Sequence, residues 1–276
     1  MQRYLSLLCP LILLAGAASA SDRHCAHTEA RNLSLNLAGV KTVMFEIANH
    51  ELRVDAAPGR NATIGGRACA SNADFLGQLT LTHERRGDKL VVRARREGNR
   101  LFGMGNQYAY MELSGNVPDD VMVQVVVGSG DAWVTGASAL SIDVGSGDVE
   151  ARRIKGHVTA KVGSGDIELD DIGSLNVLSI GSGDVVARNV RGNAEVGSIG
   201  SGDFTVKGAG GNVDIGSIGS GDADVERVTG NVVVGSVGSG SLDAQGVSGN
   251  LTVRSKGSGD INHSGIAGAI DIPRRR

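Results

Sequence analysis

Apolar and polar residues alternate in short runs through most of the chain beyond residue 116. Val149 and Ala151 stand four and six places after Gly145, and a third apolar residue and a second glycine follow before alternation resumes. Such alternation indicates a strand with one buried face, and no segment shows the 3.6-residue period or the length of a helix. Each unit therefore predicts a corner, a short strand, a second corner and a second short strand.

The unit recurs at a nearly constant spacing. The tripeptide GSG begins at Gly128, Gly145, Gly163, Gly181, Gly200, Gly219, Gly238 and Gly257, at intervals of 17, 18, 18, 19, 19, 19 and 19. One unit cannot bury its own apolar face, whereas stacked units can. The sequence therefore predicts an all-β fold, a single-stranded parallel β-helix (β-solenoid) of about 18–19 residues per coil, with rungs about 4.8 Å apart.

An antiparallel sandwich with turns every 8–12 residues explains the strand lengths equally well. It does not explain why the same residue types return at every second turn. We expect equivalent residues to lie above one another, with Val185, Val206 and Val225 aligned one rung apart. The longer coils should carry their extra residue in a β-bulge. Whether Ser198 or the adjacent Ile199 points inward stays open.

Glycine and acidic residues mark the corners. We expect the corner glycines to supply positive φ angles and close approach between coils. Asp follows GSG in seven of eight units, as an aspartate ladder: Asp131, Asp148, Asp166, Asp184, Asp203, Asp222 and Asp260. Stacked carboxylates repel by roughly 1 kcal/mol per pair in water. Either each Asp caps its own corner by accepting backbone N–H bonds, or cations line the ladder.

The cation alternative describes a calcium-stabilised repeat protein. Calcium takes six to eight oxygen ligands, and one Asp per coil supplies too few, so capping is the favoured interpretation. Asparagine follows the second-corner glycine in four coils, as an asparagine ladder: Asn193, Asn212, Asn231 and Asn250. We expect these amides to bond to one another along the column.

Composition narrows the core and the chemistry. The chain holds 42 Gly among 276 residues, and aromatic residues make up 3%. The core must therefore be thin and aliphatic, and Trp133, the single Trp, provides no aromatic platform for sugars. No Ser, Cys or carboxylate constellation of a hydrolase is recognisable, so we expect a protein that is not an enzyme and needs no cofactor. A polysaccharide-active β-helix enzyme is the less favoured alternative.

Residues 1–20 have the layout of a cleavable signal peptide, with an early Arg, an apolar run and a small-residue ending. No later stretch approaches the ~20 apolar residues that span a bilayer, so we expect no transmembrane segment in the mature chain. Cys25 and Cys69 most simply form one disulfide in an exported protein. Metal ligation by His24, Cys25 and His27 is the weaker alternative, since no fourth ligand is evident.

Charge is uneven along the chain. Residues 22–112 hold thirteen Lys and Arg against ten Asp and Glu, and residues 119–276 hold thirteen against twenty. The pairs Arg85-Arg86 and Arg95-Arg96 alternate with apolar residues, which is typical of a solvated strand face. We therefore expect no nucleic-acid partner.

Repeated GSGD and Gly-Asn corners, preceded by the step Val117 to Val121 (VPDDV), resemble the bacterial "putative adhesin" β-solenoid family, a domain of unknown function related to the head GIN domain. The resemblance begins near Val40 and implies a single-stranded parallel β-helix without catalytic residues. It also implies that Val43 to Val54 form a first coil turning at Ala48-Asn49-His50, and that Leu79 to His83 and Leu90 to Arg95 form a hairpin.

The predicted organisation is a signal peptide at 1–20, an irregular β cap with a first coil at 21–115, and the regular GSGD solenoid at 116–276. The predicted product is an exported adhesin or cell-envelope scaffold in the periplasm, on the outer-membrane surface or secreted. Its partner would be an envelope or surface component, a glycan or a protein.

Overall fold

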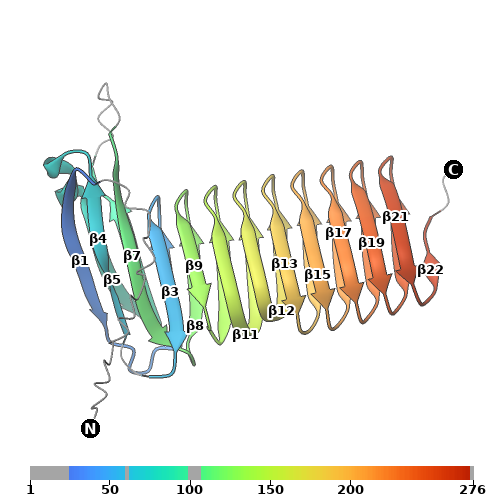
Figure 1. Ribbon diagram of the computed structural model, residues 1–276, viewed down its shortest axis with the longest axis horizontal. Helices are drawn as coiled ribbons and strands as arrows, with labels where there is room; N and C mark the ends of the chain where they lie inside the picture. The colour runs from blue at the N-terminus through green and yellow to red at the C-terminus, as the bar shows by residue number, and fades with distance from the viewer. Residues whose placement is uncertain (1–24, 60–61, 99–106, 274–276) are drawn as a thin grey trace, which may run out of the picture.

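Two stacks of strands form a rod with a cap at one end, as Figure 1 shows. The computed structural model describes residues 25–59, 62–98 and 107–273. From the first coil onward neighbouring rungs pair in parallel, so the predicted β-solenoid is confirmed and the antiparallel sandwich is wrong.

The first stack holds the strands that follow the GSG corners. They are β3 (Glu51–Ala57), β9 (Asp131–Thr135), β11 (Val149–Val162), β12 (Ile167–Ile180), β13 (Val185–Val190), β15 (Phe204–Ala209), β17 (Ala223–Val228), β19 (Ser241–Val247) and β21 (Asp260–Ile266). The second stack is β2 (Thr42–Ile47), β8 (Met122–Val127), β10 (Ala139–Val144), the later halves of β11 and β12, β14 (Ala194–Ile199), β16 (Val213–Ile218), β18 (Val232–Val237), β20 (Leu251–Lys256) and β22 (Ile270–Asp271).

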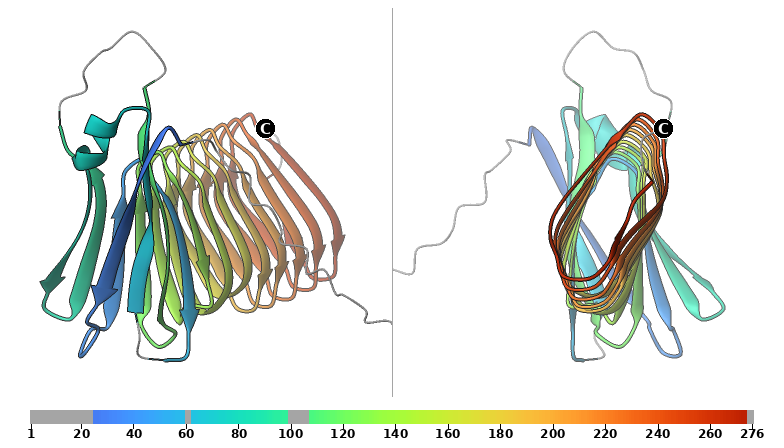
Figure 2. Two further views of the ribbon diagram at one scale, coloured as in Figure 1. Left: turned by 60° about the vertical axis from the view of Figure 1, so that its left-hand side comes forward. Right: turned by 90° about the vertical axis from the view of Figure 1, so that its right-hand side faces the viewer.

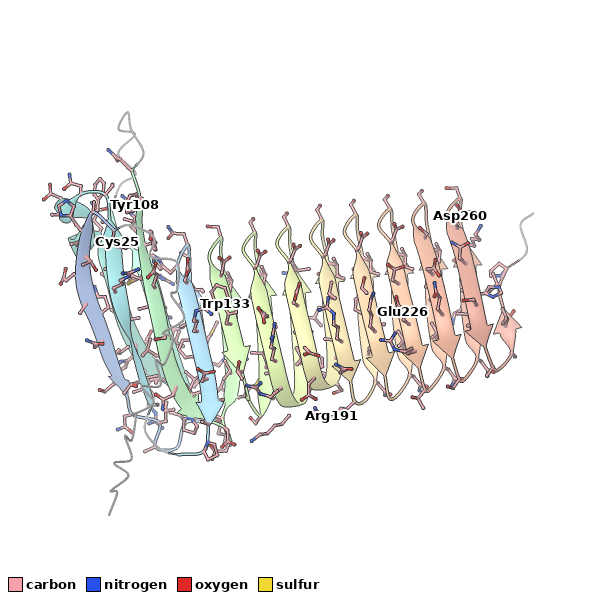
Figure 3. All side chains as sticks on the ribbon, in the orientation of Figure 1. Cys25, Tyr108, Trp133, Arg191, Glu226 and Asp260 are labelled. Atoms are coloured by element: carbon pink, nitrogen blue, oxygen red, sulfur yellow. A yellow bond between two sulfur atoms is a disulfide. The ribbon has the colours of Figure 1, made fainter. Side chains whose placement is uncertain are left out.

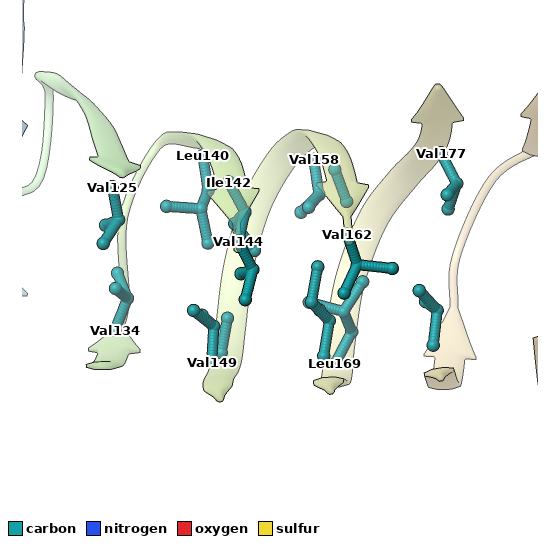
Figure 4. Close-up of a cluster of buried hydrophobic side chains, with 14 of the residues drawn as sticks. Val125, Val134, Leu140, Ile142, Val144, Val149, Val158, Val162, Leu169 and Val177 are labelled. Carbon is teal, nitrogen blue, oxygen red and sulfur yellow. The ribbon is translucent and has the colours of Figure 1, made fainter. Parts of the chain in front are cut away.

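The coils are flattened, as the end-on view of Figure 2 shows, and aliphatic side chains fill the narrow space between the two stacks (Figure 4). They form the two predicted columns of the first stack. Val185 lies between Ile167 and Phe204, whereas Val206 and Val225 continue the column of Ala187. The expected alignment of Val185 with Val206 and Val225 is therefore wrong by two residues. The stacking of equivalent apolar residues of successive coils is confirmed.

The residue that lengthens the coils to nineteen lies at the second corner, where Val190 and Ala194 are one residue farther apart in sequence than their partners Ile172 and Leu175. The expectation that a β-bulge holds this residue is therefore wrong, and the bulge of the second stack is already present in the 18-residue coil of β12. The register between β11 and β12 shifts after Ala160, where β12 gains a residue at Leu178. Later coils keep this bulge, so Gly197 and Ser198 both stand between the buried Val196 and Ile199. Isoleucine therefore points inward and serine outward, which resolves the alternative that the sequence left open.

The GSG corners require glycine because the backbones of neighbouring coils approach closely there, and not because the backbone is left-handed. None of the GSG glycines in the described chain has a φ in the left-handed region, so the expectation of positive φ is wrong for them. Instead, each second glycine of the tripeptide lies directly over its counterpart in the coil below, and a Cβ would overlap that residue's carbonyl oxygen. The tight rung spacing at this corner excludes any side chain.

Residues with a left-handed backbone conformation form a separate column. Each lies eight positions after the first glycine of a GSG tripeptide. They are Gly136, Arg153, Asp171, Asn189, Gly208, Arg227, Gly246 and Gly265, with φ between 53° and 90°. The left-handed residue breaks the strict alternation of the strand, so that two consecutive side chains point outward between two buried ones. Arg152 and Arg153, for example, stand between the buried Ala151 and Ile154. Four of the eight are not glycine and carry conformational strain.

We expect Arg227→Gly to stabilise the protein by about 0.5–1 kcal/mol, because glycine adopts φ near +56° without a Cβ penalty. The exposed pair with Glu226 that is lost contributes little. Urea unfolding followed by circular dichroism measures the change. Arg227→Ala is the matched control, since it loses the same ion pair and keeps the strain. Equal stability of the two variants would contradict the argument.

The cap consists of β1 (His27–Leu35), which precedes the first coil, and of an excursion between β3 and β8 that interrupts the winding of the first coil into the second. The excursion contains β4 (Ala62–Ala70), the 3₁₀ helix η1 (Ala73–Gln78), β5 (Leu79–Arg86), β6 (Lys89–Arg96) and β7 (Ala109–Pro118). The hairpin β5–β6 adds to the end of the second stack through β2, and the antiparallel set β1–β4–β7 adds to the first stack through β3. The predicted hairpin and first coil are both confirmed.

The first coil consequently lies between cap and rod. β2 pairs with β6 on one side and β8 on the other, and β3 pairs likewise with β7 and β9. The corner Ala48-Asn49-His50 accepts backbone hydrogen bonds from the first GSG corner, for example from the N–H of Ser129 to the carbonyl of Ala48 at 2.6 Å. β7 runs across the predicted boundary near residue 116, and that boundary stays a prediction.

A disulfide joins Cys25 to Cys69 of β4, with their Cα atoms 5.5 Å apart. It fastens the start of β1 to its antiparallel neighbour. The predicted signal peptide at 1–20 lies outside the described residues. Within the described residues, no helix is long and apolar enough to cross a membrane.

Candidate functional site

The aspartate ladder is a chain of hydrogen bonds between successive coils. Oδ1 of Asp166 accepts the backbone N–H of Asp184 at 3.0 Å, and Oδ1 of Asp184 accepts that of Asp203 at 2.9 Å. The same contact runs from Asp131 to Asp148, Asp148 to Asp166, and Asp203 to Asp222. The expectation that each Asp accepts backbone N–H bonds of its own corner is therefore wrong. Each of these carboxylates accepts the backbone N–H of the next coil instead.

The departure from Asp at position 241 fits the same pattern. Oδ1 of Asp222 accepts both the backbone N–H of Ser241 at 2.8 Å and its hydroxyl at 2.5 Å. Asp260 stands in register with Ser241 in the following rung. Most carboxylates of the ladder thus use one oxygen to tie two rungs together, and the cation alternative stays a prediction.

We expect Asp203→Ala to lower the free energy of unfolding by about 1 kcal/mol, because the N–H of Asp222 loses its acceptor. Asp203→Asn should cost much less, since the amide oxygen replaces Oδ1 and charge repulsion falls. Urea unfolding distinguishes the two. If Asn were as harmful as Ala, and millimolar calcium raised the melting temperature of the wild type alone, the ladder would be a cation site instead.

The asparagine ladder works in the same way at the opposite corner. Oδ1 of Asn193 accepts the N–H of Asn212 at 3.0 Å, and Oδ1 of Asn231 accepts that of Asn250 at 2.8 Å. The column continues from Asn250 to Ala269. The expected amide-to-amide bonding is replaced by bonding from side chain to backbone.

Acidic side chains also stack on the outer face of the first stack. Asp224 lies beside Asp243 in register. Partial burial raises the pKa of Asp224, and the neighbouring carboxylates of Asp243, Asp222, Asp203 and Glu226 raise it further. A carboxyl with a raised pKa in the folded state weakens folding once it ionises, so this group favours the folded state as the pH falls through its range.

Metal ligation finds no support at the predicted positions. Within residues 25–59, 62–98 and 107–273, no group of three or more His, Cys, Asp or Glu side chains is placed to hold a metal ion. Cys25 is committed to the disulfide, and His24 lies outside the described residues.

Arginines of the cap hairpin form ion pairs across the strands. Glu46 contacts Arg93 at 2.8 Å and Arg95 at 2.7 Å, and Glu84 contacts Arg93 and Arg86 at 2.8 Å. Hydrogen bonds from Arg86 and Arg93 lower the pKa of Glu84 to about 2. The Arg pairs singled out in the sequence therefore serve, at least in part, to join β2, β5 and β6.

Trp133 is partly covered by a cation. The guanidinium carbon of Arg53 lies 3.9 Å from its ring centroid, from the neighbouring strand β3. A shallow cavity of about 250 Å³ beside the ring is lined by carboxylates of the ladder and by Glu150 and Glu168. Figure 3 shows Trp133 on the side of the rod, close to the cap.

A pocket is formed where the cap meets the first two corners. This corner pocket of about 350 Å³ lies between Asn49–Glu51, Ser129–Asp131, the stretch Gln107–Tyr110 that leads into β7, and Arg96 at the end of β6. The rings of Tyr108 and Tyr110 have centroids 6.0 Å apart and planes tilted by 44°. Their bodies are half-buried, with Ala109 buried between them.

His50 is a buried polar residue in this pocket. It replaces the second glycine of a GSG corner, and its ring fits because β7, instead of another corner, lies on the cap side. Nδ1 accepts the N–H of Met111 at 3.1 Å, whereas Nε2 is buried and has no hydrogen-bond partner in the described part of the chain. Burial lowers the pKa of His50 to about 4, so the imidazole is neutral at pH 7.

Signals for this pocket in the sequence are weak. The sequence places His50 in an atypical corner and Asp131 at the first rung of the ladder, but it predicts no role for the tyrosines. Their approach depends on β7 pairing with β3, about 60 residues earlier in the chain. The loss of GSG at the first coil is the one local feature that marks the place.

Comparison with known proteins places the chain in a family. A model of the family described as Toastrack DUF4097 matches residues 40–265. Among curated proteins none matches. The chain is similar to a solved structure described as a putative lipid binding protein from Parabacteroides distasonis ATCC 8503, with 16% identity over 90% of this chain and 98% of that one and a TM-score of 0.42.

Two further solved structures are similar at the same level. One, described as a putative adhesin from Parabacteroides merdae ATCC 43184, shares 12% identity over 90% of this chain and 97% of that one, with a TM-score of 0.41. The other, described as a putative cell adhesion protein from Clostridium sporogenes ATCC 15579, shares 13% identity over 88% and 100%, with a TM-score of 0.37. On the evidence of the matched family model, which spans all the regular coils but the end of the last, the chain belongs to the Toastrack DUF4097 family.

Proposed function

We propose that the protein is an exported, non-enzymatic scaffold of the cell envelope that contacts a surface component, either a glycan or a protein. The observation that carries the proposal is the repetition of outward polar side chains at one-rung spacing along the rod. Thr205, Asp224 and Asp243, for example, occupy one column of the first stack. A rigid array of similar contacts suits weak multivalent binding, in which many modest interactions act together.

Two further features support export. The first twenty residues have the layout of a secretory signal, and the cap carries the disulfide Cys25–Cys69. Disulfides of this kind form and persist in oxidising compartments such as the periplasm or the cell exterior. The periplasm, the outer-membrane surface and the medium all meet this condition.

Cell fractionation of a strain that produces the full chain tests export. We expect the protein outside the cytoplasm, shortened at its N-terminus and with Cys25 and Cys69 oxidised, as measured by mass spectrometry under non-reducing conditions. Retention in the cytoplasm with free thiols would overturn export.

Binding of the purified protein to washed envelope fractions tests the scaffold role. We expect saturable binding that a heat-unfolded sample lacks. Binding no greater than that of the unfolded sample would overturn this role, whatever the result of fractionation.

A further inference from the structure

The corner pocket carries chemistry that the outer faces of the rod do not. It combines two tyrosine rings, the carboxylates of Glu51 and Asp131, and the guanidinium of Arg96 in one cavity of about 350 Å³. That volume lies at the lower end of the range of about 300–1,000 Å³ typical of small-molecule sites. A ligand of one or two sugar rings matches this size.

The mixture of groups decides between ligand classes. A phosphate or sulfate would face the carboxylates of Glu51 and Asp131, and a simple cation would face Arg96. A hydroxylated ring satisfies both kinds of group, because each hydroxyl both donates and accepts a hydrogen bond. Its C–H faces can pack on the bodies of tyrosine rings, which combine an apolar surface with a polar tip.

Tyr108 and Tyr110 are presented together by the backbone. Tyr108 directly precedes β7 and Tyr110 lies in it; both side chains are half-buried and their ring centroids are 6.0 Å apart, whereas Ala109 between them is buried. Arg96 is held in position, since its Nε donates to Gln78 Oε1 at 3.1 Å and its guanidinium lies 5.0 Å from the Phe75 ring centroid. The walls of the pocket are therefore preformed by the cap.

His50 lies behind the pocket wall, where its side chain is fully buried. Because Nδ1 accepts the N–H of Met111 and the ring is neutral, the proton resides on Nε2. A buried donor without a partner costs about 1–3 kcal/mol. Because Nε2 is closed off from the pocket, His50 shapes the wall and is not counted among the ligand contacts.

We propose that the corner pocket binds a neutral saccharide unit through hydrogen bonds with the side chain of Asn49 and with the carboxylate of Glu51, which accepts from ligand hydroxyls, and through packing on Tyr108 and Tyr110. This assignment rests on the proposed function and narrows it, since it names a glycan as the surface component and the junction of cap and rod as the place of contact.

The test is binding of defined saccharides to the full chain. Glucose, galactose, mannose and N-acetylglucosamine are titrated separately while ¹H–¹⁵N spectra report on the protein. We expect at least one of them to shift the resonances of Asn49, Gln107 and Ser129 in a saturable manner. Failure of all four, and of disaccharides made from them, to shift these resonances would overturn the saccharide assignment.

Ser129→Trp blocks the pocket from an exposed corner position, and Ser182→Trp is its matched control at the equivalent GSG serine farther along the rod. We expect Ser129→Trp to weaken saccharide binding at least tenfold and Ser182→Trp to bind as the wild type does, with both keeping the wild-type circular dichroism spectrum. Tyr110→Ala gives a second reading, with Trp133→Ala as the aromatic control outside the pocket. Undiminished binding by both Ser129→Trp and Tyr110→Ala would overturn the site.

Envelope binding by the same variants separates the two proposals. If Ser129→Trp binds envelope fractions like the wild type, the scaffold role stands and the corner pocket is not its contact. If saccharides bind at the pocket while no variant, nor the wild type, binds envelopes, the pocket stands and the scaffold role falls.

Discussion

Gly202→Ala is expected to be among the most damaging single substitutions in the rod. An alanine Cβ at this position would lie 1.8 Å from the carbonyl oxygen of Gly183 in the neighbouring coil. Both partners are backbone, so no side-chain rotation relieves the overlap, and the rungs must separate. Overpacking ordinarily costs about 1–3 kcal/mol, and we expect at least the upper end here, which corresponds to a fall in melting temperature of roughly 10 °C.

Gly208→Ala is the matched control for this prediction. Its φ is +90°, but the nearest heavy atoms to an added Cβ are 3.9 Å away, so it tests the conformational cost alone. We expect a loss of about 1 kcal/mol from this variant. Thermal unfolding by circular dichroism or calorimetry compares the two. A Gly202→Ala protein as stable as Gly208→Ala would show that rung spacing does not select glycine at the GSG corner.

Removal of the disulfide is expected to have the second large effect, confined to the cap. Cys25 and Cys69 are 44 residues apart in sequence. On a chain-entropy estimate, a closed loop of this length stabilises by about 4 kcal/mol. In a Cys25→Ser, Cys69→Ala protein we expect β1 and β4 to lose hydrogen-exchange protection, because β1 pairs only with β4 among the described strands and is largely exposed.

Strands in the middle of the rod provide the internal control. β15 is covered by rungs on both sides and lies far from the cap, so its exchange should stay at the wild-type rate. Reduction of the wild-type protein should reproduce the pattern of the double variant. Equal loss of protection in β1 and β15 would show that cap and rod unfold as one unit, and no loss in β1 would show that pairing with β4 suffices.

Much of the rod could be read from the sequence because its interactions repeat. A residue that lies over its counterpart one coil away meets the same chemistry each time, so the spacing of Gly145, Gly163 and Gly181 reports directly on contacts in space. The two buried columns followed from that regularity, whereas the first coil without GSG was expected from the family resemblance. Finer geometry did not follow from the regularity, and the ladder carboxylates were assigned to the wrong coil because a single unit does not reveal which neighbour supplies the N–H.

By itself, then, the sequence determined that this chain winds into stacked parallel rungs around an aliphatic interior, since a periodic order of residues imposes a periodic order of contacts. Only the tertiary structure decided how the rod ends. The excursion that places β6 and β7 outside the first coil contains no sequence repeat from which it could be predicted. This excursion brings His50, Tyr108 and Tyr110 to one pocket. Contacts between segments of unlike sequence depend on how the chain packs, and no local pattern encodes them.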